Sequence, residues 1–258
     1  MAACLNHFSQ DSIKKTMAFV FEELDCQETP LGLISLRMRA EPRLDNRILY
    51  EVKLGDEFLM SSLFPEAEIQ LSRLGLEALR NNGHVEALDI VVGGLGLGYT
   101  ANAALEDEKV RSLLVIDIMP AVIEWHQKHL VPLGEVLSTD TRCTLQLGDF
   151  FELATNSEMG FPPLNQKVHG IFLDIDHSPS NWLDQENSNF YTEKSLEKMK
   201  KKIVVGGIFG LWSNDLPDND FTALLESVFD NVETHVVAFD NPYSGNNSTN
   251  SVYLAHVL

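Results

Sequence analysis

The sequence has few cysteines, no long apolar run and few basic residues. Its three cysteines, Cys4, Cys26 and Cys143, are odd in number and far apart, so they form neither a disulfide framework nor a metal-binding motif. No stretch approaches the roughly 20 apolar residues of a membrane span. The first residues, MAACLNHFSQDSIKK, lack the basic segment and apolar run of a secretory signal. We therefore expect a cytoplasmic protein with reduced thiols, no membrane partner and no metal.

Basic residues are also scarce beside acidic ones. The chain has 19 Lys and Arg against 38 Asp and Glu, which gives a net charge of −19 at pH 7 with His neutral. Such a surface repels phosphate backbones, so we expect no nucleic-acid partner. It attracts cationic small molecules, but solubility alone favours acidic surfaces too, so the charge points only weakly to a ligand.

The N-terminal part has the pattern of a small β-rich extension. After a polar, partly helical lead-in over residues 1–25, residues 31–39 and 48–62 alternate apolar and polar side chains, which predicts an antiparallel sheet. A helix is then predicted from Pro65 to Gly83, because proline favours the first helical turn and glycine the end of a helix. With 258 residues, one large domain suffices. We therefore expect an extension over residues 1–63.

Residues 64–258 have the pattern of a Rossmann-like, doubly wound α/β domain. Beyond residue 85, short apolar runs alternate with helical segments; the runs are LDIVVGG, SLLVIDI, CTLQLGDFF, GIFLDID and GGIFGLW. Buried strands separated by helices are typical of a parallel sheet covered on both faces. Two closing strands, joined across the Gly/Asn/Ser-rich residues 241–250, predict a final hairpin.

A glycine-rich loop follows the first of these strands. Glycines allow positive φ and let backbone N–H groups approach a ligand at the carboxyl end of a strand, where such sheets bind cofactors. The sequence from Gly96 to Ala101 also fits the G-x-G-x-x-A dinucleotide fingerprint. The predicted cofactor-binding residues of the loop are Gly93, Gly94, Leu95, Gly96 and Gly98.

Acidic residues at two further strand ends narrow the choice of cofactor. Asp117, followed by Ile118, ends the second strand, where a carboxylate accepts hydrogen bonds from the ribose hydroxyls of NAD or S-adenosylmethionine (AdoMet). Asp149 follows the third strand and is placed to accept from an adenine amino group while Phe150 packs on the ring, although it also fits a helix N-cap. Together the features favour an adenosyl sulfonium over a dinucleotide.

The glycine-rich loop and the acidic strand ends, together with the later segments FYTEKSL and GGIF, have the order and spacing of a known family. Over roughly residues 48–258 the chain resembles the spermidine synthase-like branch of the class I AdoMet-dependent transferases. The resemblance implies a seven-stranded sheet with an antiparallel last strand, a small N-terminal β-domain and often a homodimer. It implies AdoMet or decarboxylated AdoMet as cofactor, with Asp117 at the ribose, Asp149 at the adenine and Asp174 as the catalytic aspartate.

Several positions depart from the family pattern. Spermidine synthases have a G-G-G-D-G-G loop whose aspartate binds the amino end of decarboxylated AdoMet, and the aligned residue here is Gly96. Met119 replaces an aspartate after the ribose acid, and residues 29–32 (TPLG) keep half of a T-P-Y-Q segment. Loss of a carboxylate that pairs with a buried ammonium would cost several kcal/mol. An uncharged loop with free N–H groups would instead accept the carboxylate of ordinary AdoMet. The departures therefore favour AdoMet as the donor and methyl transfer as the reaction.

The predicted acceptor site follows the fourth strand. Asp174, Asp176 and His177 stand where the family has D-S-S-D-P, and they form a candidate cluster that binds a cation and accepts a proton, although Asp176 and His177 also fit a turn. Transfer from a sulfonium needs in-line geometry and a deprotonated acceptor. Tyr191 and Trp212 are candidates to wall the acceptor pocket, or else core residues.

Two other features receive structural interpretations. His126 and His129 lie three apart on a predicted helix, but no third metal ligand is within sequence reach, so we expect surface histidines. The basic residues 198–202 (KMKKK) are expected to form the C-terminal turn of a helix.

The sequence thus predicts an AdoMet-dependent transferase that methylates a small-molecule acceptor, expected to be a cationic amine. The alternatives are an aminopropyltransferase that uses decarboxylated AdoMet, a nucleoside-binding protein without catalysis, and an NAD-dependent reductase. The identity of the acceptor does not follow from the fold.

Overall fold

The computed structural model describes residues 20–29, 31–175 and 177–258. Its strands are β1 (Phe21–Thr29), β2 (Gly32–Glu41), β3 (Arg47–Leu54), β4 (Glu57–Ser61), β5 (Leu88–Gly93), β6 (Val110–Asp117), β7 (Cys143–Leu147), β8 (Val168–Leu173), β9 (Ile203–Ser213), β10 (Asn231–Asn241) and β11 (Asn246–His256). Its α-helices are α1 (Glu66–Asn81), α2 (Tyr99–Leu105), α3 (Pro120–Gln127), α4 (Gly134–Thr139), α5 (Phe150–Thr155), α6 (Glu193–Lys200) and α7 (Asn219–Val228), and its 3₁₀ helices are Pro42–Leu44 and Gln185–Asn189. In this part of the chain, no helix combines the length and apolarity needed to cross a membrane.

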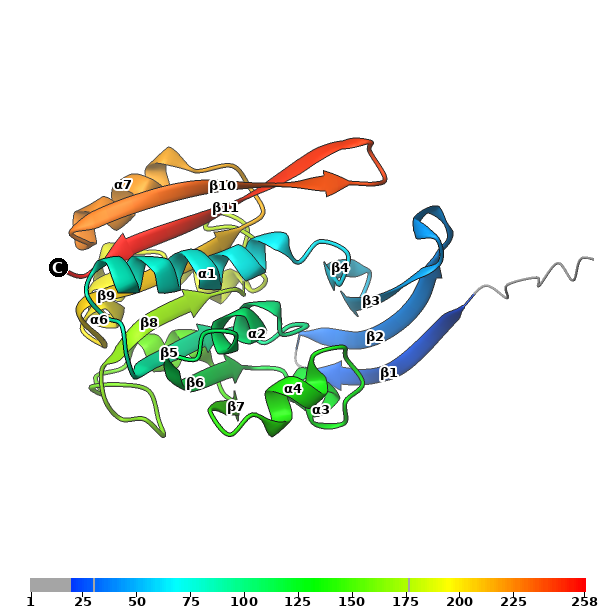
Figure 1. Cartoon of the computed structure of the whole chain (residues 1–258), viewed down its shortest axis with the longest axis horizontal. Helices are drawn as coiled ribbons and strands as arrows, with labels where there is room; N and C mark the ends of the chain where they lie inside the picture. The colour runs from blue at the N-terminus through cyan, green and yellow to red at the C-terminus, as the bar shows by residue number, and fades with distance from the viewer. Residues whose placement is uncertain (1–19, 30, 176) are drawn as a thin grey trace, which may run out of the picture.

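The strands form two sheets (Figure 1). The N-terminal sheet is antiparallel in the order β1-β2-β3-β4, and the second has seven strands in the order β10-β11-β9-β8-β5-β6-β7. Strands β5 to β9 run parallel, whereas β11 is antiparallel to both β9 and β10. The predicted doubly wound sheet, its antiparallel last strand and the N-terminal β-sheet are therefore confirmed.

Helices cover both faces of the seven-stranded sheet. Because side chains alternate along a strand, Ile90 and Val92 of β5 pack into the apolar cluster that includes helices α1 to α4, while Val91 packs into the cluster that includes α5 to α7. All three side chains are fully buried. Burial on both faces explains why β5 is a continuous apolar run in the sequence.

The first strand corrects the predicted lead-in. Phe21–Thr29 is β1, so the end of the expected polar, partly helical segment is a strand; residues 1–19 lie outside the described residues. Polar tertiary contacts hold β1 in place: Trp125 Nε1 of α3 donates to Asp25 Oδ2 at 2.6 Å, and Gln27 Nε2 donates to Glu124 Oε2 at 2.8 Å. Because these contacts are polar, the sequence of β1 lacks the apolar alternation from which a strand is predicted.

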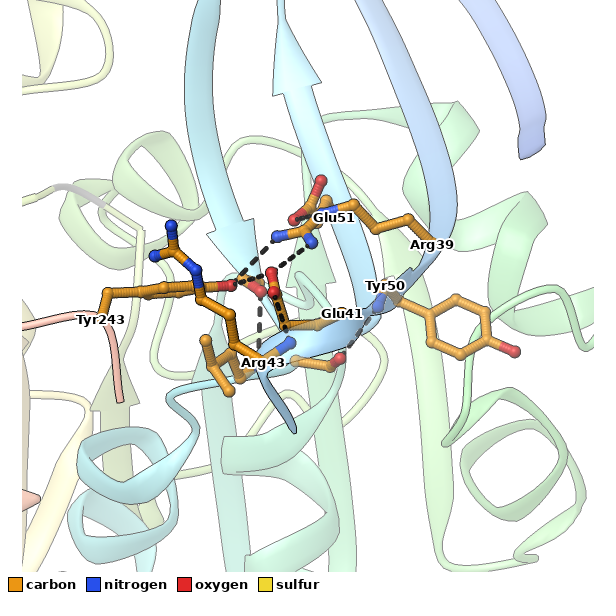
Figure 2. Close-up of polar contacts among 9 residues, drawn as sticks. Arg39, Glu41, Arg43, Tyr50, Glu51 and Tyr243 are labelled. Atoms are coloured by element: carbon orange, nitrogen blue, oxygen red, sulfur yellow. Dashed lines mark hydrogen bonds and ion pairs between the residues drawn. The ribbon is translucent and has the colours of Figure 1, made fainter. Parts of the chain in front are cut away.

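The hairpin of β10 and β11 joins the two sheets. It extends beyond the seven-stranded sheet toward β3 and β4 (Figure 1). At its tip the Tyr243 hydroxyl donates to Glu41 Oε2 at 2.7 Å, and Arg39 bonds both Glu41 and Glu51 at 2.6 Å (Figure 2). The Arg39 guanidinium and the Tyr243 hydroxyl together lower the pKa of Glu41 to about 2. The hairpin thus closes one side of the space between the sheets.

The basic stretch after α6 is only partly the expected helix end. Lys198 and Lys200 lie in the last turn of α6, as predicted. Lys202 is instead only 1% exposed, and its Nζ donates to Asn156 Oδ1 at 2.7 Å and to two backbone carbonyls at 2.8 and 3.1 Å. This lysine is a buried structural residue.

Candidate active site

A cavity of about 170 Å³ lies at the carboxyl edge of the parallel strands. It brings together predicted residues from the ends of four strands, since parallel strands end at one edge of a sheet. The predicted residues that line it are Gly94, Gly96, Asp117, Ile118, Asp149, Phe150 and Asp174. The cavity is therefore a candidate cofactor site.

The glycines of the loop also pack against the protein itself. Gly94 has a φ of +95°, and a Cβ there would lie 2.0 Å from the Asp174 carbonyl oxygen. Gly96 has a φ of +48°, and a Cβ there would lie 2.9 Å from Met60 Sδ. Side chains at Gly93 and Gly98 would likewise meet neighbouring side chains. The loop thus needs glycines for close packing as well as for the approach of a ligand.

Several loop N–H groups are already hydrogen-bonded, which corrects the expectation of a loop with free donors. Gly94 and Gly98 donate to backbone carbonyls at 2.9 and 2.8 Å. The Leu95 N–H donates to Asp117 Oδ2 at 2.9 Å. A cofactor carboxylate would have to compete with these partners, so the loop is less suited to receive it than the sequence suggested.

Asp117 connects this loop to the end of β6. Its Oδ2 accepts from Leu95 and its Oδ1 from the Met119 N–H at 2.8 Å. Burial raises the pKa of Asp117, and the backbone N–H bonds oppose that rise. A carboxylate has about four lone-pair sites, so it still has acceptor capacity for ribose hydroxyls. Ile118, beside it, is 55% exposed and also lines the cavity.

Asp149 is the N-cap of α5, the alternative that the sequence left open. Its Oδ1 accepts from the N–H groups of Phe151 at 2.8 Å and Glu152 at 3.2 Å. Phe150 is only 2% exposed, and its ring stacks on Phe161 with centroids 6.1 Å apart. The half-buried Phe151, which sequence reasoning missed, also lines the cavity and offers more surface to a ligand.

Asp174 lies where the main cavity meets a second one of about 80 Å³. Thr100 Oγ1 donates to Asp174 Oδ2 at 2.6 Å. Burial raises the pKa of Asp174 to about 6, and the bond from Thr100 opposes the rise. A carboxylate with this pKa, oriented by one hydroxyl, is suited to accept a proton near neutral pH.

A third cavity, of about 630 Å³, continues outward between the N-terminal sheet and the hairpin. It shares Glu68, His177 and Trp212 with the second cavity. In the described part of the chain, the buried nitrogen Trp212 Nε1 has no hydrogen-bond partner. The three cavities adjoin one another, because neighbouring ones share lining residues.

The predicted acceptor residues fall in different places. His177 lines the second cavity, with Nε2 3.1 Å from Glu57 Oε1, and Trp212 also lines this cavity. Asp176 lies outside the described residues. Tyr191 is not among the residues that line these three cavities; its ring packs on Phe221 at 5.9 Å, beside the cluster of α5 to α7. The structure favours the core alternative for Tyr191.

The prediction of a surface position for His126 is wrong. Its side chain is fully buried, with Nε2 3.0 Å from the Gly96 carbonyl oxygen, because α3 packs beneath the glycine loop. Burial lowers the pKa of His126 to about 4, so the ring is neutral and holds the loop. His129 is exposed, as expected. Over residues 20–29, 31–175 and 177–258, no group of three or more His, Cys, Asp or Glu residues could hold a metal ion.

Comparison with known proteins places the fold. No family model matches the chain. A polyamine aminopropyltransferase of Sulfolobus acidocaldarius is 28% identical over 195 residues, which cover 72% of this chain and 57% of the relative, a little over half its length. A spermidine synthase in complex with the transition-state analogue AdoDATO aligns with a TM-score of 0.67 and 14% identity, over 92% of this chain and 74% of that one. Human methyltransferase-like protein 13, in complex with SAH, aligns with a TM-score of 0.55 and 17% identity, over 74% of this chain and 82% of that one.

Proposed function

Because the chain has the spermidine synthase-like class I AdoMet-dependent transferase fold, we propose that it transfers an aminopropyl group from decarboxylated AdoMet to a small amine. In this reaction the acceptor nitrogen forms a bond to the propyl carbon as the bond from that carbon to sulfur breaks. The sulfur keeps the electron pair and leaves as 5′-methylthioadenosine. The acceptor's proton passes to a carboxylate.

The charge of the site is the observation that carries this proposal. Asp117, Asp149 and Asp174 line the main cavity, and no Lys or Arg is among the described residues that line the main or the second cavity. A sulfonium and a terminal ammonium complement these carboxylates. The carboxylate that AdoMet keeps would lie near like charges with no Lys or Arg among the described lining residues to pair with it, which is costly in a buried site.

The comparisons support the same choice. The curated relative is an aminopropyltransferase, and a spermidine synthase aligns with a higher TM-score than the human methyltransferase-like protein. This reverses the preference for methyl transfer that the sequence suggested from Gly96. That preference relied on a loop able to accept a carboxylate, whereas the loop N–H groups of Gly94, Leu95 and Gly98 are bonded within the protein.

We assign the roles of the site residues from their positions. Asp117 binds the ribose hydroxyls, and Asp149 with Phe151 borders the adenine. Asp174, with a pKa of about 6, is largely ionised at neutral pH and takes the proton of the attacking amine. His177 and Trp212 line the path by which the acceptor arrives.

Methyl transfer from AdoMet is the second candidate, because Gly96 supplies no side-chain carboxylate in the loop.

The homodimer and the cytoplasmic location expected from the sequence stay predictions.

Product analysis tests the proposal. The protein is incubated with decarboxylated AdoMet or AdoMet and a panel of di- and monoamines, and the nucleoside product is identified by mass spectrometry. We expect 5′-methylthioadenosine from the decarboxylated donor, in amounts that depend on the amine. Formation of S-adenosylhomocysteine from AdoMet instead would establish methyl transfer, and binding of either donor without any product would favour the non-catalytic alternative.

A further inference from the structure

Glu68 is a half-buried acidic residue with no assigned role in binding the cofactor or the acceptor. It lies in the first turn of α1 and lines both the second and the third cavity. Its Oε2 is buried and has no hydrogen-bond partner among residues 20–29, 31–175 and 177–258. An unpartnered buried carboxylate oxygen is rare, because it gives up hydration without compensation.

The charge of Asp174 adds to the free-energy cost of ionising Glu68. Burial raises the pKa of Glu68 well above its usual range, and the charge of Asp174 raises it further. Thr100 connects the two, since its Oγ1 lies 2.6 Å from Asp174 Oδ2 and 3.3 Å from the Glu68 backbone carbonyl oxygen. Two carboxylates that line one cavity, with no Lys or Arg among its described lining residues, are an arrangement that a bound cation would stabilise.

The second cavity lies where the chain on a bound sulfonium would extend. It shares Gly96 and Asp174 with the cofactor cavity, and the loop residues 95–99 line one part of it. A donor whose ribose is bound at Asp117 can therefore extend past Gly96 into this space. The loop itself presents no carboxylate there, and Met60 Sδ occupies the position that a side chain at residue 96 would take.

Resting on the proposed function, we propose that Glu68 binds the terminal ammonium of the donor's aminopropyl chain and thereby selects decarboxylated AdoMet over AdoMet. The carboxylate comes from helix α1 rather than from the glycine loop. AdoMet carries a carboxylate on the carbon that bears its ammonium, so it would bring a negative charge toward both Glu68 and Asp174. Glu68 is therefore a specificity-determining residue, and Asp174 remains free to serve the acceptor.

Calorimetric titration of a small set of variants tests this assignment. Wild type, Glu68→Gln, Glu68→Asp and Glu66→Gln are titrated with decarboxylated AdoMet and with 5′-methylthioadenosine, which lacks the aminopropyl chain. Glu66 is the matched control: it lies in the same helical turn, its Oε2 is also buried with no partner among the residues that the structure describes, and it lines none of the three cavities.

We expect Glu68→Gln to weaken the binding of decarboxylated AdoMet by about tenfold or more, since a charge-assisted bond is lost. The affinity for 5′-methylthioadenosine should stay within about twofold, because that ligand has no ammonium to lose. Glu68→Asp, which keeps the charge, should recover part of the loss, and Glu66→Gln should bind like wild type.

Other outcomes separate the two proposals. If Glu68→Gln binds decarboxylated AdoMet as wild type does, or only raises the KM of the acceptor amine, Glu68 does not bind the donor and this inference is overturned while the proposed function stands. If wild type binds neither ligand, the proposed function fails first. Retained binding of 5′-methylthioadenosine by each variant shows that it is folded.

Discussion

The hydroxyl of Thr100 lowers the pH above which the proposed base, Asp174, is ionised. Thr100 is 3% exposed, and its Oγ1 donates to Asp174 Oδ2 at 2.6 Å. This bond favours the ionised form and so lowers the pKa of Asp174, against the larger effect of burial. Thr100→Val keeps the shape of the side chain and removes the donor. The pKa of Asp174 should therefore rise above its value of about 6.

The size of the rise follows from the strength of the bond. A hydrogen bond to a charged group contributes about 1.5–3 kcal/mol, and one pKa unit corresponds to about 1.36 kcal/mol, so we expect a rise of about one to two units. At pH 7 the ionised fraction of Asp174 would fall from roughly nine tenths to between about one half and one tenth. The acid limb of kcat/KM should move to higher pH by the same amount.

The pH dependence of kcat/KM, measured from about pH 5 to 9 with decarboxylated AdoMet and an accepted amine, reports this shift. Thr100→Ser keeps the hydroxyl and should retain the wild-type acid limb. If Thr100→Val has the wild-type profile, Thr100 does not tune the group that titrates, and the assignment of Asp174 as the base loses its support.

Three further substitutions test other parts of the account. Asp117→Ala should weaken the binding of 5′-methylthioadenosine about tenfold or more in calorimetry, because the ribose hydroxyls lose a charged acceptor; unchanged affinity would place the ribose elsewhere. Asp174→Asn should retain the binding of 5′-methylthioadenosine but lose turnover. It should also be more stable than wild type at pH 8 by about 3 kcal/mol. The reason is that folding raises the pKa of Asp174 from 3.8 to about 6, so the wild-type protein loses stability as the pH rises through that interval. Thermal unfolding checks this difference, which should narrow at pH 4; a gap independent of pH would contradict it. Lys202→Met should lower the free energy of unfolding by about 2–3 kcal/mol, because it leaves buried acceptors unpaired. In the same denaturation assay, the exposed control Lys201→Met should change this free energy little. Equal effects of the two substitutions would show that burial of Lys202 is not the cause.

Much of the fold and part of the candidate site could be predicted because they depend on chain order. Buried strands separated by helices imply a parallel sheet, and residues that follow its strands must meet at one edge. Asp117, Asp149 and Asp174 each follow a strand, so their convergence on one cavity needed only the strand assignments. The glycine loop was recognisable because it, too, directly follows a strand of this sheet, β5.

The residues that the sequence did not reveal are placed by packing between distant elements. Glu68 looks like one of the acidic residues that favour the first turn of a helix, and only the contact of α1 with the loop region makes it part of the site. His126 lies on an amphipathic helix, and its burial depends on which face meets the loop. Phe150 and Phe151 are neighbours in sequence, so only the direction in which α5 begins decides which ring enters the core.

The most direct test of the central claim is a calorimetric titration of the wild-type protein with decarboxylated AdoMet, AdoMet and NAD side by side. An anionic site with no Lys or Arg among its described lining residues should bind decarboxylated AdoMet most tightly, AdoMet more weakly and NAD not measurably. Tighter binding of AdoMet than of its decarboxylated form would contradict the account and return methyl transfer to first place.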